Sequence, residues 1–141
     1  KDLEKMLIKC ENKDFVFASR YLEGGGSDDD TIITYIGNKI FSFLGRLLFS
    51  LNLSDILYTY VLGETSKFRK LNIKSNDFRF CVEFPIKIEI SKMNYISMPS
   101  YEKKRIGGKK KVSEMKDGFL ILTEMLKLFF NSKIFWKKVI N

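Results

Sequence analysis

The chain has 141 residues, of which 45% are hydrophobic and 14% aromatic, enough for one domain with a moderate core and too apolar for a disordered segment. The formal net charge of +8 favours phosphate-bearing partners, whether nucleic acid, an anionic membrane surface or a charged small substrate. The sequence contains no histidine, which excludes His-based triads and most zinc sites and leaves carboxylates, Lys, Tyr and two cysteines for any chemistry.

Cysteine, proline and glycine usage indicates the redox compartment of the chain and the number of its domains. Cys10 and Cys81 are far apart and lack metal-site spacing, so we expect buried free thiols in a reducing compartment rather than a disulfide. The chain begins with Lys1 and enters a helical pattern at once, which suggests a piece of a longer protein. Proline is rare and no repeat or Gly/Ser linker interrupts residues 1–141, so we expect a single domain.

The first elements predict an α/β sheet with a ligand site at one strand end. Residues 2–11 carry apolar side chains at i, i+3, i+4 and i+7, the pattern of a short amphipathic helix. Residues 15–19 form a short apolar run, as expected for a strand covered on both faces. Ligands of open α/β sheets bind beyond the carboxyl ends of strands, so Arg20 is a candidate phosphate contact. Capping of the strand end, or pairing with Glu23, is the alternative.

A loop rich in glycine and then in aspartate follows this strand. Three glycines at 24–26 and three aspartates at 28–30 predict a mobile loop, because glycine costs backbone entropy and the carboxylates repel one another. Asp28 and Asp30 superficially resemble a divalent-cation pair. Because a helix follows, we expect them instead to cap its N-terminus, where negative charge meets the positive end of the helix dipole.

Residues 36–51 predict a helix that is apolar over most of its circumference, with polar residues at four-residue spacing. Spanning a bilayer takes about 20 apolar residues, and this shorter run contains Lys39 and Arg46. We therefore expect the helix to lie in a membrane interface or under a partner. A buried core helix is the alternative.

Asp55 is the lone acid of an apolar and aromatic stretch, residues 53–60. A carboxylate in such surroundings has its pKa raised, which suits a general base. A helix cap or a turn residue is the alternative. Further along, residues 78–83 alternate between apolar and polar, and a helical pattern begins at Phe84 with Pro85 in its first turn.

Residues 95–99 predict a second strand, which leads into a basic loop. Residues 98–111 place six cationic side chains around Gly107 and Gly108. Glycine lets the backbone approach a ligand closely, while arginine and lysine bind phosphate oxygens, so we interpret the loop as an anion-binding loop. The alternative is a flexible, solvated run of charges.

The end of the chain predicts an amphipathic or interface helix region over 112–141. A helical pattern with one apolar side runs from 112 to 130. Aromatic and basic residues then mix at 133–138, which suits a membrane interface, although a packed C-terminal helix explains them too.

The order of these features resembles family 2 glycosyltransferases of the GT-A fold, in the branch of dolichyl-phosphate-mannose synthase and bacterial polyprenyl-phosphate sugar transferases. The resemblance runs from about Asp14 to Leu128. Its motifs are, in order, Ala18-Ser19-Arg20-Tyr21-Leu22-Glu23-Gly24-Gly25-Gly26, Gly37-Asn38-Lys39, Leu53-Ser54-Asp55-Ile56-Leu57-Tyr58-Thr59-Tyr60, Asp77-Phe78 with Glu83, Met98-Pro99-Ser100-Tyr101-Glu102 and Arg105-Ile106-Gly107-Gly108.

The resemblance implies a partial GT-A (Rossmann-like) α/β domain with a short mixed sheet and flanking amphipathic helices. It implies that the parent enzyme transfers a sugar, with inversion, from a nucleotide-diphosphate donor to a polyprenyl or dolichyl phosphate at the cytoplasmic membrane face. Asp55 matches the acid near the reacting centre, proposed as base or acceptor organiser. The implied contacts to substrate or phosphate are Arg20, Tyr21, Gly24, Gly25, Gly26, Tyr58, Arg105, Lys109 and Lys110.

The sequence departs from the family pattern in ways that limit the expectation. The N-terminal nucleotide-binding half, with the paired aspartates that hold Mg²⁺ or Mn²⁺, is absent, so we expect no metal ligands in this chain and no activity of the fragment alone. Thr59 stands where the family commonly has Gly. Lys110 and Lys111 replace the usual Ser-Asn or Ser-Lys.

A second hypothesis is a non-catalytic basic module that binds anionic membrane or phosphate ligands through residues 103–111 and the C-terminal tail around Trp136. Nucleic acid is the least favoured partner, because the aromatic residues lie in apolar runs rather than among the basic ones. A sheet edge exposed by truncation would favour a homodimer.

Overall fold

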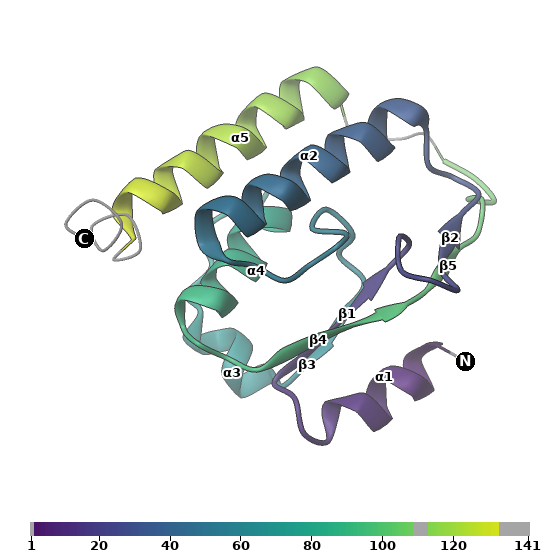
Figure 1. Cartoon of the computed structure of the whole chain (residues 1–141), viewed down its shortest axis with the longest axis horizontal. Helices are drawn as coiled ribbons and strands as arrows, with labels where there is room; N and C mark the ends of the chain where they lie inside the picture. The colour runs from purple at the N-terminus through teal and green to yellow at the C-terminus, as the bar shows by residue number, and fades with distance from the viewer. Residues whose placement is uncertain (1, 109–112, 133–141) are drawn as a thin grey trace.

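The computed structural model describes residues 2–108 and 113–132 (Figure 1). Its central sheet has the order β3-β1-β4, with β1 (Phe15–Ser19) between β3 (Val61–Gly63) and β4 (Tyr95–Pro99). β3 runs antiparallel to β1 and β4 runs parallel to it. All five residues of β1 are buried, which confirms the strand predicted to be covered on both faces. The expected α/β class with a short mixed sheet and flanking helices is also confirmed.

A second, two-stranded sheet lies beyond the carboxyl ends of β1 and β4. It pairs β2 (Gly26–Ser27) with β5 (Tyr101–Glu102) in parallel. β1 and β4 are in register up to Ser19 and Pro99, and the backbone N–H of Ser100 donates to the carbonyl of Ser19 at 2.9 Å. The chain segments that leave both strands are therefore held side by side.

Helices cover the two faces of the central sheet unequally (Figure 1). α2 (Ile32–Phe49), α4 (Phe80–Ile90) and α5 (Glu114–Asn131) build the larger hydrophobic cluster with Phe15 and Phe17 of β1. α1 (Asp2–Cys10) covers the other face. There the smaller cluster consists of Met6, Val16, Ala18 and Met98. The alternation of side chains along β1 sends successive residues to opposite clusters.

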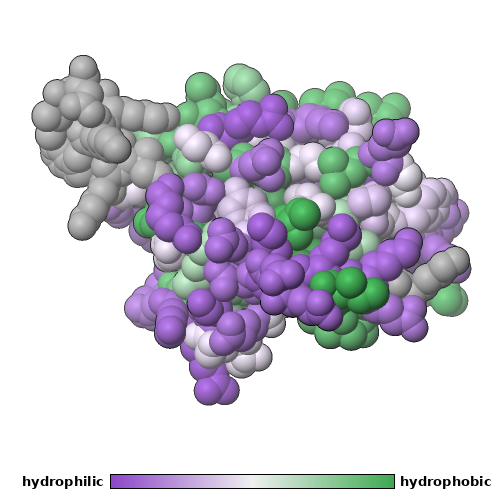
Figure 2. All heavy atoms as spheres, turned by 60° about the horizontal axis from the view of Figure 1, so that its bottom comes forward, coloured by the Kyte–Doolittle hydropathy of each residue, from purple (hydrophilic) through white to green (hydrophobic). Residues whose placement is uncertain are grey.

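The predicted helix near the N-terminus is confirmed, but only part of its apolar stripe is used. Met6 is fully buried, whereas Leu3 and Leu7 are 50% and 56% exposed. Ile8 is 69% exposed as well. In Figure 2 a hydrophobic patch stands out at the lower right of an otherwise mostly hydrophilic face, on the side where α1 lies.

α2 begins earlier than the pattern at 36 predicts because Thr31 caps it. The Thr31 side chain accepts from the backbone N–H of Thr34, and the Thr34 side chain accepts from the backbone N–H of Thr31, which completes a capping box. Asp30 stands one residue before the cap and accepts from the Thr34 hydroxyl. The aspartates at 28–30 thus lie at the helix N-terminus as predicted, but Thr31 is the capping residue.

α4 begins at Phe80, four residues before the predicted start, and Pro85 lies inside the helix rather than in its first turn. The alternation at 78–83 is misleading because this helix is buried on most sides, so its apolar residues show no clear 3.6-residue period. A short helix, α3 (Thr65–Lys70), precedes it. Cys10 and Cys81 are free thiols, as expected, and both are half-buried.

Candidate functional site

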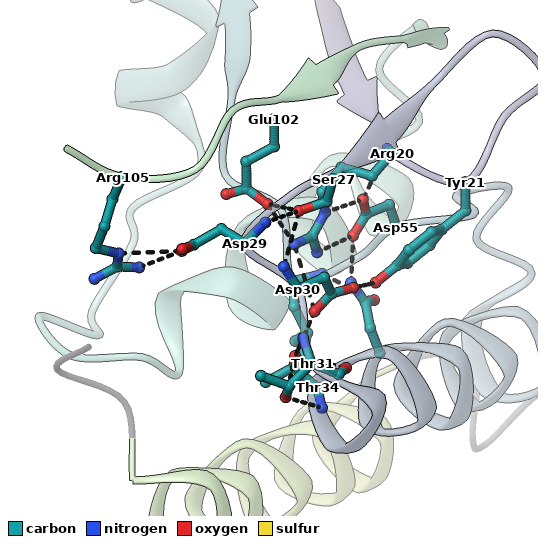
Figure 3. Close-up of polar contacts among 12 residues, drawn as sticks. Arg20, Tyr21, Ser27, Asp29, Asp30, Thr31, Thr34, Asp55, Glu102 and Arg105 are labelled. Atoms are coloured by element: carbon teal, nitrogen blue, oxygen red, sulfur yellow. Dashed lines mark hydrogen bonds and ion pairs between the residues drawn. The ribbon is translucent and has the colours of Figure 1, made fainter. Parts of the chain in front are cut away.

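Arg20, the first residue after β1, is clamped by the carboxylate of Asp55. Its Nε lies 2.8 Å from Asp55 Oδ2 and its Nη2 lies 2.9 Å from Oδ1, while its backbone N–H donates to Oδ2 at 3.0 Å. The side chains are only 11% and 0% exposed. On the other side, Arg20 Nη1 donates to Oε2 of Glu102 at 3.0 Å (Figure 3). One guanidinium thus joins the end of β1, the loop after α2 and strand β5.

α2 holds the Asp55 loop in place through two buried polar side chains. Asn38 Nδ2 donates to Asp55 Oδ1, and the Ser42 hydroxyl donates to Asn38 Oδ1 at 3.2 Å. Ser42 Oγ in turn accepts from the backbone N–H of Ile56 at 3.1 Å. Asn38 and Ser42 are 1% and 5% exposed. Of the polar residues at four-residue spacing in the sequence, Asn38 and Ser42 therefore face inward, toward the site, whereas Arg46 is exposed.

Two tyrosines enclose Arg20. The ring centroid of Tyr58 lies 4.6 Å from Arg20 Cζ, and that of Tyr21 lies 5.2 Å from it, both within cation–π range. Burial opposes the charge of Arg20, but the hydrogen bonds and charge of Asp55 outweigh it and raise the arginine pKa. Burial, followed by a hydrogen bond to Asp30, raises the pKa of the Tyr21 phenol. Arg20 is therefore charged and Tyr21 neutral at any physiological pH.

The rim of the site is acidic. The Tyr21 hydroxyl donates to Asp30 Oδ2 at 2.5 Å, and the Ser27 hydroxyl donates to Glu102 Oε2 at 2.6 Å. Arg105 Nη2 pairs with Asp29 Oδ2 at 2.8 Å, with the arginine side chain 45% exposed. Figure 3 shows the pair of Arg105 and Asp29 at one side of the residues around Arg20. Arg105 is thus the accessible guanidinium of the site and Arg20 the buried one.

Two hollows meet at Arg20 and Asp30. The larger, of about 340 Å³, is lined by Arg20, Tyr21, Gly26, Ser27, Asp30, Thr31, Ile32 and Tyr35. The smaller, of about 160 Å³, is lined by Arg20, Asp29, Asp30, Thr34, Asn38, Leu57, Glu102 and Arg105. Together they form a cleft beyond the carboxyl ends of two neighbouring parallel strands, the usual place for ligands of α/β sheets.

The residues of the cleft suit a ligand with hydroxyl groups and a single phosphate. The carboxylates of Asp30 and Glu102 accept hydrogen bonds, and hydroxyls supply them. A phosphate reaches Arg105 by displacing Asp29, whose side chain is 22% exposed, since a partly exposed ion pair contributes little stability. Arg20 is less available, because its partner Asp55 is fully buried and both are held by further hydrogen bonds.

The structure brings together most of the predicted site residues. Arg20, Tyr21 and Arg105 line the cleft, whereas Asp55 and Tyr58 contact Arg20 without lining either hollow. Lys109 and Lys110 lie outside the described residues.

The glycines form a hydrogen-bonded turn at the start of the loop after β1. Gly24 has φ +83°, a conformation that favours glycine, and the N–H of Gly25 donates to the carbonyl of Leu22 at 2.8 Å. A side chain at Gly25 would meet the carbonyl of Ser19 at 2.7 Å. Gly26 pairs with Tyr101 in the small sheet and is the one glycine of the three that lines the larger hollow.

Sequence reasoning missed Glu102, Asn38 and Ser27 as members of the site. Asn38 could have been predicted from the sequence. It lies four residues before Ser42 on an otherwise apolar helix, so the two polar side chains share one face of that helix. The sequence indicated Glu102 less clearly, by its position three residues after the end of the second predicted strand. Among residues 2–108 and 113–132, no group of three or more His, Cys, Asp or Glu is arranged to hold a metal ion.

Comparison with known proteins leaves the cleft to be interpreted from its own geometry. No protein-family model matches the chain, and no curated protein or solved structure matches it.

Proposed function

We propose that the cleft is the acceptor side of a family 2 glycosyltransferase site on a GT-A fold. In this proposal the parent enzyme transfers a sugar, with inversion, from a nucleotide-diphosphate donor to a polyprenyl or dolichyl phosphate. One observation supports it above all: the motifs that contain Arg20, Asn38, Asp55 and Glu102 meet through direct hydrogen bonds. These are four of the segments on which the resemblance to that family rests.

The residues take different parts in the proposal. Arg105, at the exposed rim, exchanges Asp29 for the acceptor phosphate. Arg20 stays bound to Asp55 and presents a fixed positive charge beneath the cleft. Asp55 is a positioning residue in this geometry, because both of its oxygens accept hydrogen bonds and its side chain is fully buried. Its part as a general base stays a prediction, and a phosphate oxygen needs no strong base to attack an anomeric carbon.

The resemblance also implies Mg²⁺ or Mn²⁺ in the parent enzyme. The described residues provide no cluster of ligands for such an ion, so no step is assigned to it here. What this chain contributes to the proposed transfer is binding and orientation of the acceptor, which converts a bimolecular encounter into a reaction between held groups.

The proposal is tested by measuring, with isothermal titration calorimetry, how tightly the chain binds a short, water-soluble isoprenyl phosphate. Arg105→Ala removes a charge-assisted hydrogen bond to the phosphate and is expected to weaken binding about tenfold or more. Arg79→Ala is the matched control, because the Arg79 side chain is 35% exposed, against 45% for Arg105, and also pairs with an aspartate, Asp77, outside the cleft. Absence of binding to the unmodified chain, or equal weakening by the two variants, would reject the proposal.

A further inference from the structure

A further hollow shares no lining residue with the cleft. It measures about 430 Å³, more than either hollow of the cleft, and is lined by residues 95–97 of β4 together with Leu22, Arg46, Asn52 and Ser54. We call it the β4-edge hollow. Since none of these residues lines the cleft, it is a separate place for a ligand.

The β4-edge hollow opens along the free edge of the central sheet. β4 is the last strand of that sheet and pairs with β1 on its other side. Successive side chains of a strand point to opposite faces of a sheet, yet three consecutive residues of β4 line the hollow. The hollow therefore follows the edge of the strand rather than one face. Arg46, in the last turn of α2, and Asn52, just beyond that helix, also line it.

Arg46 brings an uncompensated positive charge to this hollow. Arg20, Arg79 and Arg105 each pair with an aspartate. By contrast, the exposed guanidinium of Arg46 makes no hydrogen bond or ion pair with residues 2–108 and 113–132. None of the residues that line the hollow is acidic. A guanidinium without a carboxylate partner offers its planar set of donors to a phosphate or carboxylate.

Two neutral groups of the hollow also lack partners. The Ser97 hydroxyl oxygen is the one buried side-chain oxygen or nitrogen that has no hydrogen bond within the described part of the chain. A buried hydroxyl without a partner costs about 1–3 kcal/mol, so a ligand that it reaches by side-chain rotation recovers part of that cost. The backbone N–H of Asn52 donates to the Tyr95 hydroxyl at 2.9 Å, while its exposed side-chain amide has no partner among the described residues.

We propose that the β4-edge hollow binds a small oxyanion whose carbon skeleton carries hydroxyl groups. Arg46 binds the phosphate or carboxylate of this ligand, and the Asn52 amide and the Ser97 hydroxyl bind its hydroxyl groups. Leu22 and Ile96 provide apolar contact for its carbon atoms. Small-ligand sites combine apolar walls with a few convergent polar groups in this way.

The nearby end of α2 does not exclude an anion. A helix C-terminus carries a partial negative charge on its last carbonyl groups. Here the carbonyl oxygens of Gly45 and Arg46 accept from the backbone N–H groups of Leu51 and Ser50, at 3.3 and 2.9 Å. The guanidinium of Arg46 opposes the charge that remains, and the net charge of +8 attracts anions at longer range.

Isothermal titration calorimetry with glycerol 3-phosphate tests the proposal. The titrations use a chain that carries Arg105→Ala, so that phosphate binding at the cleft does not contribute. We expect binding, and we expect Arg46→Ala to weaken it about tenfold or more, because a charge-assisted hydrogen bond is lost. Arg69→Ala is the matched control. Arg69 is also exposed and has no side-chain partner among the described residues, but it lies on α3 and does not line the hollow.

Ser97→Ala tests whether the buried hydroxyl acts on the ligand or on the fold. It removes a hydroxyl without a partner in the described part of the chain, so the thermal unfolding temperature is expected to stay the same or rise slightly. Binding of glycerol 3-phosphate is nevertheless expected to weaken about fivefold, the usual effect of one neutral hydrogen bond.

Two further ligands define the chemistry of the site. Binding of glycerate as well would assign the β4-edge hollow to oxyanions in general, and binding of glycerol 3-phosphate alone would assign it to phosphate esters. Absence of binding of both anions, similar binding of uncharged glycerol, or equal weakening by Arg46→Ala and Arg69→Ala would overturn the proposal. Isoprenyl phosphate binding at the cleft is expected to survive Arg46→Ala in the chain that retains Arg105, which separates this test from that of the proposed function.

Discussion

At the scale of single residues, the buried pair of Arg20 and Asp55 supports the whole cleft. Removing the charge of Asp55 leaves a buried guanidinium without its main partner, which costs more than the pair itself contributes. Asp55→Asn is therefore expected to lower the free energy of unfolding by about 3 kcal/mol in urea denaturation. Asp77→Asn, in the exposed pair with Arg79, is expected to change stability little. Similar losses in both variants would contradict the structural role of Asp55.

Glu83 is expected to make the free energy of unfolding fall at acid pH. Burial raises its pKa, but hydrogen bonds from Lys87, Ser75 and Lys74 prevail and lower it from 4.5 to about 2. A pKa lower in the folded than in the unfolded chain means that the contribution is fully present above pH 4.5 and disappears as the pH falls toward 2. Between pH 4.5 and 2, the free energy of unfolding is expected to fall by about 3 kcal/mol through loss of this contribution.

Urea denaturation at a series of pH values checks this, with Glu83→Gln as the comparison. The variant is expected to be less stable than the unmodified chain at neutral pH and to lose less stability on acidification. Glu23→Gln, at an exposed position, is the control for the general effect of removing one carboxylate. A variant that keeps the full acid dependence would show that other carboxylates are responsible.

At the scale of elements, α2 contains two glycines in contrasting surroundings. A Cβ at Gly37 would meet no atom within 4 Å, whereas a Cβ at Gly45 would lie 3.1 Å from Ile56 Cδ1 and 3.3 Å from Leu51 Cδ2. Gly37→Ala is expected to stabilise the protein by about 1 kcal/mol, because alanine loses less backbone entropy in a helix. Gly45→Ala is expected to destabilise by about 1 kcal/mol, since Ile56 and Leu51 are buried and have little room to move.

Thermal unfolding of Gly37→Ala and Gly45→Ala measures this difference in stability. An equal gain at both positions would mean that the contact of α2 with the 51–56 segment is loose. Because that segment also carries Asp55, the result at Gly45 reports on how tightly α2 holds the site. The two substitutions are chemically identical, so helix propensity cancels between them.

At the scale of the whole molecule, the sheet is covered on two sides by helices of unequal extent. α1 alone closes the smaller cluster, and Met6 is its one fully buried side chain. Met6→Ala is expected to cost about 3 kcal/mol, the usual loss for a large buried side chain that leaves a cavity. Leu7→Ala, one residue along and 56% exposed, is expected to cost much less. Equal effects in denaturant would show that α1 does not seal this face.

Local sequence patterns were enough for several features. The apolar run at 15–19, the strand at 95–99 and most helices are confirmed, because apolar periodicity and capping residues act within a few positions of the chain. The starts of two helices are exceptions. α2 begins at Ile32 rather than at 36 because Thr31 caps it. The apolar residues of α4 face the core on most sides, so burial removed the periodic signal that locates its start.

The candidate site was only partly predictable. Arg20 and Asp55 stood out by their positions after a strand and within an apolar stretch. That Asp55 clamps Arg20, and that Glu102 binds its other side, depends on segments 35 and 82 residues apart in the chain. Pairing over such separations is decided by which strands lie next to each other, and that information is not local.

By itself, the sequence determined an α/β chain with a covered central strand, an arginine at its carboxyl end and an unusually apolar helix. Only the tertiary structure decided which side of that helix is buried. Burying Asn38 and Ser42 satisfies the Asp55 loop by hydrogen bonds, so these two residues turn inward, on the side of α2 that also packs Leu48 and Phe49 into the core, and the isoleucines face outward. A buried polar group needs a partner, whereas an exposed apolar group tolerates water, and this asymmetry sets the orientation of α2.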